Sequence, residues 1–219
     1  MSLEAHIDYT RKEWTTCSIY VEMLDYLKDK DIKNVADIGA NVGEVSKLFL
    51  ENIPTIKKIY AYEPETANFE FLKNRFLSEP RIIPIKKAMR YQAEENLLLH
   101  KGSGTGSYSK ASKKGPDTYA EHETVKCTTF EEENLGEIDL AKIDIEGSEW
   151  NVLTYSSDLK KVKYLQIEFH GWDFEDYSLA FNTKRPEEYN NYFIQKNLPN
   201  YRIVRSLEMQ YLLELKNDT

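Results

Sequence analysis

Hydrophobic and polar residues follow two different periods along this chain. Short runs of apolar and β-branched residues predict buried strands, and segments with apolar residues three or four positions apart predict helices that pack by one face. The predicted strands are residues 34–38, 58–63, 81–85, 138–144 and 163–169. The predicted helices are residues 14–30, 44–50, 67–77, 147–155 and 186–197. Pro84 predicts that its strand lies at a sheet edge or ends there.

Two regions depart from this alternation of strands and helices. Residues 96–100 and 124–130 resemble strands on either side of a polar, glycine-rich stretch, which composition alone predicts to be a flexible surface hairpin. The last two apolar runs, residues 201–207 and 209–215, predict an antiparallel hairpin. We therefore expect an α/β fold, a doubly wound, Rossmann-like sheet of about seven strands that ends with this hairpin.

The first predicted strand enters the next helix through two closely spaced glycines. The sequence from Asp37 to Gly43 reads Asp-Ile-Gly-Ala-Asn-Val-Gly, with Gly39 directly after the strand. Glycine permits a tight turn, and a turn that opens a helix presents backbone N–H groups and a positive dipole end to a ligand. This arrangement is typical of α/β proteins that bind nucleotides or nucleoside-like cofactors.

A carboxylate, Glu63, ends the second predicted strand, and Thr66 after it is a candidate cap for the following helix. An acid at this place can accept hydrogen bonds from both hydroxyls of a ribose. Dinucleotide-binding enzymes share this acid, but their turn usually carries three glycines. The two glycines here, preceded by Asp37, fit better with a ligand without phosphates, such as S-adenosylmethionine.

Three motifs occur in the order and spacing of the FkbM-type methyltransferases, and the chain resembles that family over roughly residues 34–170. They are the Asp37–Gly43 turn, Tyr-Glu-Pro at 62–64 and Lys-Ile-Asp-Ile-Glu-Gly-Ser-Glu at 142–149, with Glu-Phe-His at 168–170 extending the match. The resemblance implies a class I S-adenosylmethionine-dependent fold and, usually, methyl transfer to a hydroxyl oxygen. The acceptors of the family include sugars, lipid-linked saccharides and polyketides.

The glycine turn, the acid at the end of the second strand and the class I fold together predict which residues hold the cofactor. Gly39 and Asn41 would face its methionine end, Glu63 its ribose, and Ala88 and Met89 its adenine. The complete set of predicted cofactor-binding residues is Asp37, Gly39, Asn41, Gly43, Glu63, Ala88, Met89 and Asp144. The resemblance further favours a mobile active-site loop at residues 102–115, because loops that close over ligands need a permissive backbone.

Polar residues that suit catalysis follow the later strands. Asp144, Glu146, Glu149, Glu168 and His170 lie at or just beyond strand ends, where open α/β sheets bind ligands. The predicted catalytic residues are His170, Asp144 and Glu146. His170 is the preferred base, since the ordinary pKa of histidine is about 6.5, and Asp144 would orient the acceptor.

Other interpretations of these acids stay open. Asp144 and Glu146 precede a helix and could cap it, and Glu149 could stabilise the helix dipole or form a local salt bridge. Asp144, Glu168 and His170 could together hold a divalent metal that lowers the pKa of a hydroxyl, although Glu168 could equally point away from the site. We commit to no metal.

Length, charge and composition limit the classes of function that the chain can have. The length of 219 residues suits one domain, 1–219, with a helical segment at about 1–30 and a catalytic core at about 34–216. The net charge of −8 argues against a nucleic-acid partner. No apolar run is long enough for a membrane span, the N-terminus does not resemble a signal peptide, and the two cysteines fit a reducing cytoplasm.

The sequence thus predicts an O-methyltransferase with a small-molecule or saccharide acceptor. Its 15 tyrosines could line a sugar-binding cleft or lie at the wet edge of a core. The alternative is a non-catalytic module that binds S-adenosylmethionine or a nicotinamide cofactor. The cluster of acids with His170 favours the enzyme, because a binding module does not need it.

Overall fold

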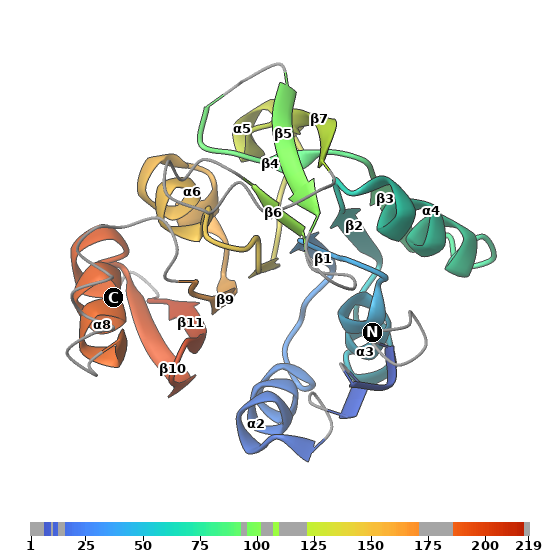
Figure 1. Ribbon diagram of the computed structural model, residues 1–219. Helices are drawn as coiled ribbons and strands as arrows, with labels where there is room; N and C mark the ends of the chain where they lie inside the picture. Colours follow the sequence, from blue (N-terminus) through green and yellow to red (C-terminus); the bar gives the residue numbers. More distant parts are fainter. Residues whose placement is uncertain are drawn as a thin grey trace.

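The computed structural model describes residues 7–9, 11–12, 16–92, 96–101, 107–109, 122–170 and 186–216. Its centre is a seven-stranded sheet in the order β10-β11-β9-β8-β1-β2-β3 (Figure 1). The strands are β1 Asn34–Ile38, β2 Lys58–Tyr62, β3 Ile82–Ile85, β8 Leu140–Ile143, β9 Tyr164–Glu168, β10 Tyr201–Leu207 and β11 Gln210–Leu215. All neighbours from β9 to β3 pair in parallel, whereas β11 is antiparallel to both β9 and β10. The predicted doubly wound α/β fold is confirmed.

Helices cover both faces of this sheet, so each face has its own apolar core. The helices are α2 Ser18–Leu27, α3 Glu44–Asn52, α4 Thr66–Arg75, α5 Phe130–Glu133, α6 Glu149–Tyr155 and α8 Pro186–Asn197, with a short 3₁₀ turn at Leu159–Lys161. Residues of α2, α3 and α4 pack on one face, and residues of α6 and α8 pack on the other. Trp150 of α6 is fully buried in the second core, against Phe169 and Phe193.

A second, smaller sheet lies beside β2 and β3 (Figure 1). It has the order β4-β7-β5-β6, with β4 Ala88–Met89, β5 Asn96–Lys101, β6 Ser107–Ser109 and β7 His122–Thr128. The expected strands near 96 and 124 exist and pair antiparallel, while the parallel pairing of β4 with β7 is an addition. Apart from β6, the predicted mobile loop at 102–115 lies outside the described residues.

Several predicted boundaries change in the structure. The helix predicted over residues 14–30 corresponds to α2, which ends at Leu27, and residues 13–15 lie outside the described part of the chain. Glu65, not Thr66, caps α4, because its side chain accepts the N–H of Asn68 at 2.8 Å and Thr66 is already helical. Helix α6 begins at Glu149 rather than at Gly147, since Glu146 and Gly147 have φ values of 54° and 107°, which no right-handed helix contains.

Two other expectations concern the limits of the fold. Strand β3, which contains Pro84, lies at the edge of the large sheet, as its proline predicts. Within the part of the chain that the structure describes, no helix is both long enough and apolar enough to cross a membrane.

Candidate functional site

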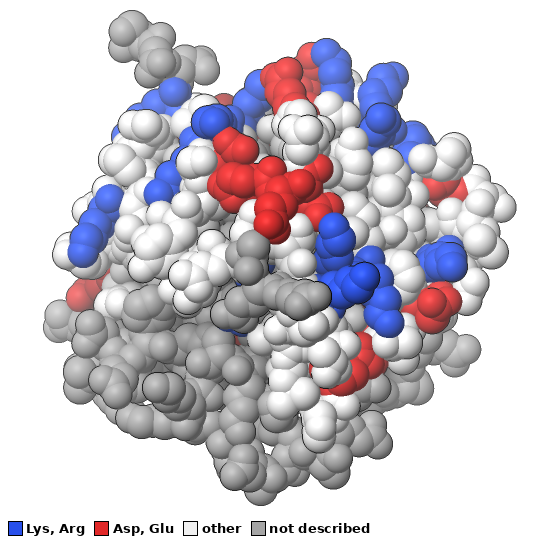
Figure 2. Space-filling model, turned by 90° about the horizontal axis from the view of Figure 1, so that it is seen from above, with Lys and Arg blue, Asp and Glu red and all other residues white. Residues whose placement is uncertain are grey.

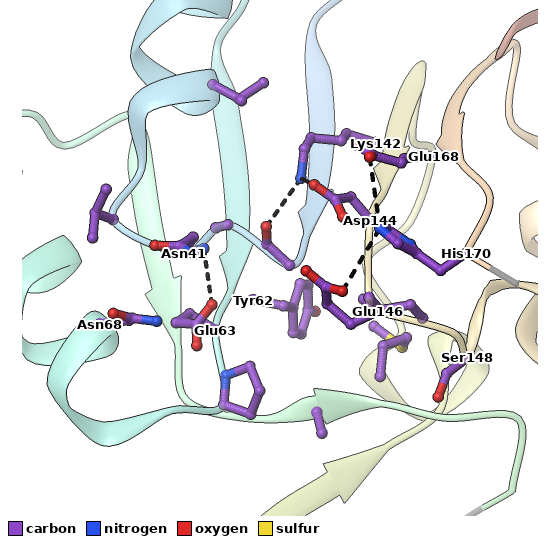
Figure 3. A pocket seen from close by; sticks show the side chains of 18 of the residues that line it. Asn41, Tyr62, Glu63, Asn68, Lys142, Asp144, Glu146, Ser148, Glu168 and His170 are labelled. Atoms are coloured by element: carbon purple, nitrogen blue, oxygen red, sulfur yellow. Dashed lines mark hydrogen bonds and ion pairs between the residues drawn. The ribbon is translucent and has the colours of Figure 1, made fainter. Parts of the chain in front are cut away.

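One cavity of about 320 Å³ lies at the carboxyl ends of β1, β2, β8 and β9 (Figure 3). The predicted site residues that line it are Gly39, Asn41, Glu63, Ala88, Met89, Asp144, Glu146 and His170. Asp37 and Gly43 do not line it. The cavity therefore joins both halves of the predicted site, the cofactor turn after β1 and the acids after β8 and β9.

Gly39 lets the turn after β1 lie directly against the end of β8. Its φ is +85°, and a Cβ atom there would lie 1.8 Å from the carbonyl oxygen of Asp144. The N–H groups of Gly39 and Ala40 both donate to the carbonyl of Tyr62, at 3.0 and 2.8 Å. No larger residue fits this position, and the turn is therefore fixed between β2 and β8.

Glu63 is tied to this turn through its carboxylate. Its two oxygens accept the N–H groups of Asn41 and Glu65, both at 2.8 Å, and the residue is only 5% exposed. Burial raises the pKa of Glu63 to about 7, although these two hydrogen bonds act against the shift. Each carboxylate oxygen carries two lone pairs, so each can still accept a hydroxyl donor. The residue thus fits a ligand diol, such as a ribose.

Gly43 allows two helices, α3 and α4, to pack closely. A Cβ atom at Gly43 would lie 2.5 Å from side-chain atoms of Leu72 and Phe76, so the glycine lets the start of α3 approach α4. Its φ of +79° also suits glycine. The cofactor role predicted for Gly43 stays a prediction, and any such role is indirect.

A buried lysine, Lys142, connects Asp37 to the pocket. Its Nζ donates to the carbonyl oxygen of Gly39 at 3.0 Å and lies 3.4 Å from Asp37 Oδ1 and 3.3 Å from Asp144 Oδ2. Asp37 is fully buried and also accepts the hydroxyl of Ser46 at 2.6 Å. Burial acts to lower the pKa of Lys142, but the charges of Asp144 and Asp37 outweigh it and raise the pKa.

Sequence reasoning did not single out Lys142 as a site residue. The sequence does contain a pattern that predicts its position. Side chains two positions apart on a strand share a face, so Lys142 is expected on the same face as Asp144. The lysine compensates the buried charge of Asp37 and holds the glycine turn and Asp144 together. Asp37 can therefore act on a cofactor only from behind the pocket wall.

His170 lies among carboxylates at the other end of the pocket (Figure 3). Its Nδ1 is 2.9 Å from Glu149 Oε1, and its Nε2 is 3.7 Å from Glu146 Oε2 and 3.6 Å from Glu168 Oε1. The indole N–H of Trp150 donates to the carbonyl of His170 at 2.8 Å, which fixes the backbone. The imidazole therefore has carboxylates at both nitrogens.

Glu149 has a role that the sequence did not reveal. Its carboxylate is fully buried, accepts the N–H groups of Ile145 and Gly147, and contacts His170. The residue thus closes the sharp turn before α6 and orients the imidazole at once. Neither of the sequence interpretations, dipole stabilisation or a local salt bridge, included this contact with His170.

Burial and neighbouring charges act against each other on the pKa values of this cluster, and the net shift is upward for His170, Glu146 and Glu168. Burial lowers the pKa of His170, but the hydrogen bond to Glu149 and the neighbouring carboxylates outweigh it and raise the pKa to about 10. Burial raises the pKa of Glu146 to about 7, against the attraction of His170. Burial and the charge of Asp144 raise the pKa of Glu168 to about 7. At neutral pH, His170 is therefore the cation of the cluster.

Asp144, Glu149 and His170 offer ligand atoms within 4.8 Å of one another, which is a spacing that a metal ion could use. However, Nδ1 of His170 and Oε1 of Glu149 are hydrogen-bonded to each other, and a protonated imidazole has no free lone pair. The other predicted set, with Glu168 in place of Glu149, needs the same imidazole. These residues form an ion-pair network, and a metal ion would have to displace the proton between His170 and Glu149, so we derive no metal-dependent step.

The charges on the outer surface differ from those in the pocket. On the face shown in Figure 2, described Lys and Arg side chains lie in separate groups with acidic and uncharged residues between them. That face therefore shows no continuous basic surface of the kind that phosphate backbones require.

The strand order, the antiparallel β11 and the cavity at the carboxyl ends define the architecture of class I, Rossmann-like methyltransferases. The family model described as the methyltransferase FkbM domain matches residues 37–207. The chain belongs to this family. A comparison with curated proteins finds no match.

Solved structures agree on the fold. The FkbM methyltransferase of Methylobacillus flagellatus KT is 18% identical, with a TM-score of 0.54 over 92% of this chain and 47% of that chain. The chain thus spans about half the length of that relative. A fibrillarin/Nop5p complex matches at 15% identity and a TM-score of 0.56, covering 94% of this chain and 82% of that one. The SAH-bound methyltransferase PaMTH1 of Podospora anserina matches at 12% identity and 0.51, covering 98% and 88%.

Proposed function

We propose that the protein transfers the methyl group of S-adenosylmethionine to a hydroxyl oxygen of a sugar, glycoconjugate or secondary metabolite. The observation that carries this proposal is the single cavity described above. One end has the Gly39 turn and Glu63, which suit a nucleoside, and the other has ionisable groups that can accept a proton. Membership of the FkbM methyltransferase family and the SAH-bound neighbour support the choice of cofactor.

Residues of both sheets would hold the cofactor. Glu63 would accept the ribose hydroxyls, and the Gly39–Asn41 turn would face the methionine end. Ala88 and Met89 of β4 line the cavity together with apolar residues of β5, which suits an adenine ring. When bound, S-adenosylmethionine supplies an electrophilic methyl carbon, and its sulfur keeps the electron pair of the broken bond.

Glu146 is the proton acceptor that the geometry supports best. A hydroxyl must lose its proton as the new C–O bond forms, and a carboxyl with a pKa of about 7 is suited to accept it at neutral pH. Glu146 lines the cavity in a left-handed conformation with φ 54°, a strained backbone that often marks a functional position. Asp144 would orient the acceptor.

The role of His170 as the base stays a prediction, and its surroundings set a condition on it. With a pKa of about 10, the imidazole is charged and unable to take a proton at neutral pH. In this state it would hold Glu146 and Glu168 in place by charge, at 3.7 and 3.6 Å. The pH dependence of turnover distinguishes the two bases.

The first test concerns cofactor binding. Glu63→Ala should weaken the affinity for S-adenosylhomocysteine by about 1–3 kcal/mol, because charge-assisted hydrogen bonds to the ribose are lost. Isothermal titration measures this, with Glu70→Ala on the exposed face of α4 as the matched control. If Glu63→Ala bound S-adenosylhomocysteine with unchanged affinity, the assignment of Glu63 to the ribose would be overturned. Binding of NAD but not of S-adenosylhomocysteine to the wild-type protein would overturn the choice of cofactor.

The second test concerns the proton acceptor, with tritiated S-adenosylmethionine and methyl glycosides of glucose, mannose, galactose and rhamnose. Glu146→Gln should lower turnover by about 10²–10⁴-fold and leave cofactor affinity unchanged. Glu208→Gln is the matched control, since Glu208 also has φ 54° but lies exposed between β10 and β11. Wild-type turnover should rise with pH through about 7. A rise only near pH 10 would assign the base to His170 instead.

A further inference from the structure

A row of polar side chains crosses the large sheet beneath the pocket. Asp37, Lys142 and Gln166 are register neighbours on β1, β8 and β9, so their side chains share one face. The adjacent residue in β11 is Leu212, which belongs to the apolar core. Lys142 and Gln166 line the cavity, and Gln166 is only 1% exposed.

A short hydrogen-bond relay fixes the orientation of the Gln166 amide. The side chain of Gln210 hydrogen-bonds to the carboxylate of Glu168, and the amide nitrogen of Gln166 donates to Gln210 Oε1 at 3.2 Å. While Glu168 is ionised it can only accept, so Gln210 must turn its NH₂ group toward it and its oxygen toward Gln166. Reversing either amide would bring two acceptors or two donors together. The Oε1 atom of Gln166 is therefore the acceptor at the end of the relay that is farther from Glu168, and no group of the relay donates to it.

Gln166 Oε1 has no hydrogen-bond partner among the described residues, although it is buried. The charged neighbour, Lys142, donates to the carbonyl of Gly39 and forms ion pairs with Asp37 and Asp144, and it makes no hydrogen bond to Gln166 Oε1. The other neighbour, Leu212, is apolar. Buried polar atoms are almost always paired, so an unpaired acceptor on a residue that lines a ligand cavity points to a group supplied by the ligand.

We propose that Gln166 is a specificity-determining residue for the acceptor, and that its Oε1 accepts a hydrogen bond from a second hydroxyl, distinct from the one that is methylated. This inference rests on the proposed methyltransferase function. The neighbouring groups, Asp144, Glu146 and Glu168, are also hydrogen-bond acceptors, and they carry negative charge when ionised. A neutral, polyhydroxylated acceptor complements this set of hydrogen-bond acceptors, because Lys142 and His170 already pair with their charges.

The first experiment compares two variants of the relay. Gln166→Leu removes the unpaired oxygen. Gln210→Met disrupts the relay but keeps the oxygen of Gln166. Gln166→Leu should raise KM for the best neutral methyl glycoside by about 10–100-fold, since the hydroxyl of the acceptor loses its partner. Gln210→Met should raise KM by a smaller factor than Gln166→Leu, because the oxygen of Gln166 remains but is no longer held in one orientation. Both variants should bind S-adenosylhomocysteine as the wild type does, and melting temperatures check that both fold.

The second experiment pairs the protein with deoxy analogues of that glycoside. The analogue that lacks the recognised hydroxyl should bind the wild-type protein as weakly as the parent glycoside binds the Gln166→Leu variant. The Gln166→Leu variant should bind this analogue and the parent glycoside with equal affinity. Isothermal titration in saturating S-adenosylhomocysteine measures this without turnover. A structural role of Gln166 would weaken the parent and every deoxy analogue equally.

The outcomes separate this inference from the proposed function. Wild-type protein that binds no S-adenosylhomocysteine overturns the proposed function and the inference with it. Wild-type protein that methylates the glycosides but shows no coupling between Gln166 and any hydroxyl overturns the inference alone. Loss of cofactor affinity in Gln166→Leu, or a preference for methyl glucuronide over the neutral glycosides, would also overturn it.

Discussion

At the scale of single residues, Gly39 is the position where the structure most clearly requires one residue type. Gly39→Ala should lower the free energy of unfolding by about 3 kcal/mol or more, because the left-handed backbone is strained and the new methyl group meets the carbonyl of Asp144. Urea denaturation measures the change.

Gly136→Ala is the matched control for this substitution. Gly136 has a similar φ of +76°, but no atom lies within 4 Å of the position that its new methyl group would take. The control should therefore cost only the backbone strain, about 1–2 kcal/mol. Equal losses in the two variants would mean that the contact with Asp144 is not the reason for the glycine.

The sequence predicted which residues gather at the site better than it predicted their states. Glycines, acids and a histidine after strand ends indicated the pocket, because parallel strands bring their carboxyl ends to one edge. The charge of His170 could not be predicted, since it depends on a 2.9 Å contact with Glu149. The unpaired oxygen of Gln166 was equally hidden, because it depends on the orientation of Gln210, which comes from another strand.

At the scale of elements, the cap of α4 offers a direct test. Glu65→Ala should lower the free energy of unfolding by about 0.5–2 kcal/mol, because the N–H of Asn68 loses its acceptor. Thr66→Ala, next to it, should cost less, since Thr66 is exposed and its hydroxyl is hydrogen-bonded to Glu123 and Lys86 rather than to the helix backbone. A larger loss in Thr66→Ala would restore the cap expected from the sequence.

The central strands were the most predictable elements. The bounds of β1 agree with the sequence prediction, and β2 ends at Tyr62, one residue before the predicted end at Glu63. Both were predictable because each is an apolar run that ends at a glycine turn or a proline. The small sheet was less predictable. Strand β4 has only two residues, Ala88 and Met89, and its pairing with β7 depends on how the chain returns to the large sheet. No local pattern carries that information.

At the scale of the whole molecule, the pocket should work without a metal. EDTA treatment should leave turnover unchanged, and added magnesium should not increase it, because the ligand atoms of Glu149 and His170 are already hydrogen-bonded to each other. Turnover of protein dialysed against EDTA, with a zinc-dependent enzyme as the control for chelation, measures this. Activity that EDTA abolishes and magnesium restores would show that the ion-pair network rearranges around a cation.

The position of β11 has a consequence for how the protein is made. This strand follows every other strand of the large sheet in chain order, yet it lies between β9 and β10. During synthesis the earlier strands leave the ribosome first, so β9 and β10 must wait with unpaired edges until Gln210–Leu215 has emerged. Messenger truncated before codon 210 should therefore yield aggregating chains that depend on chaperones.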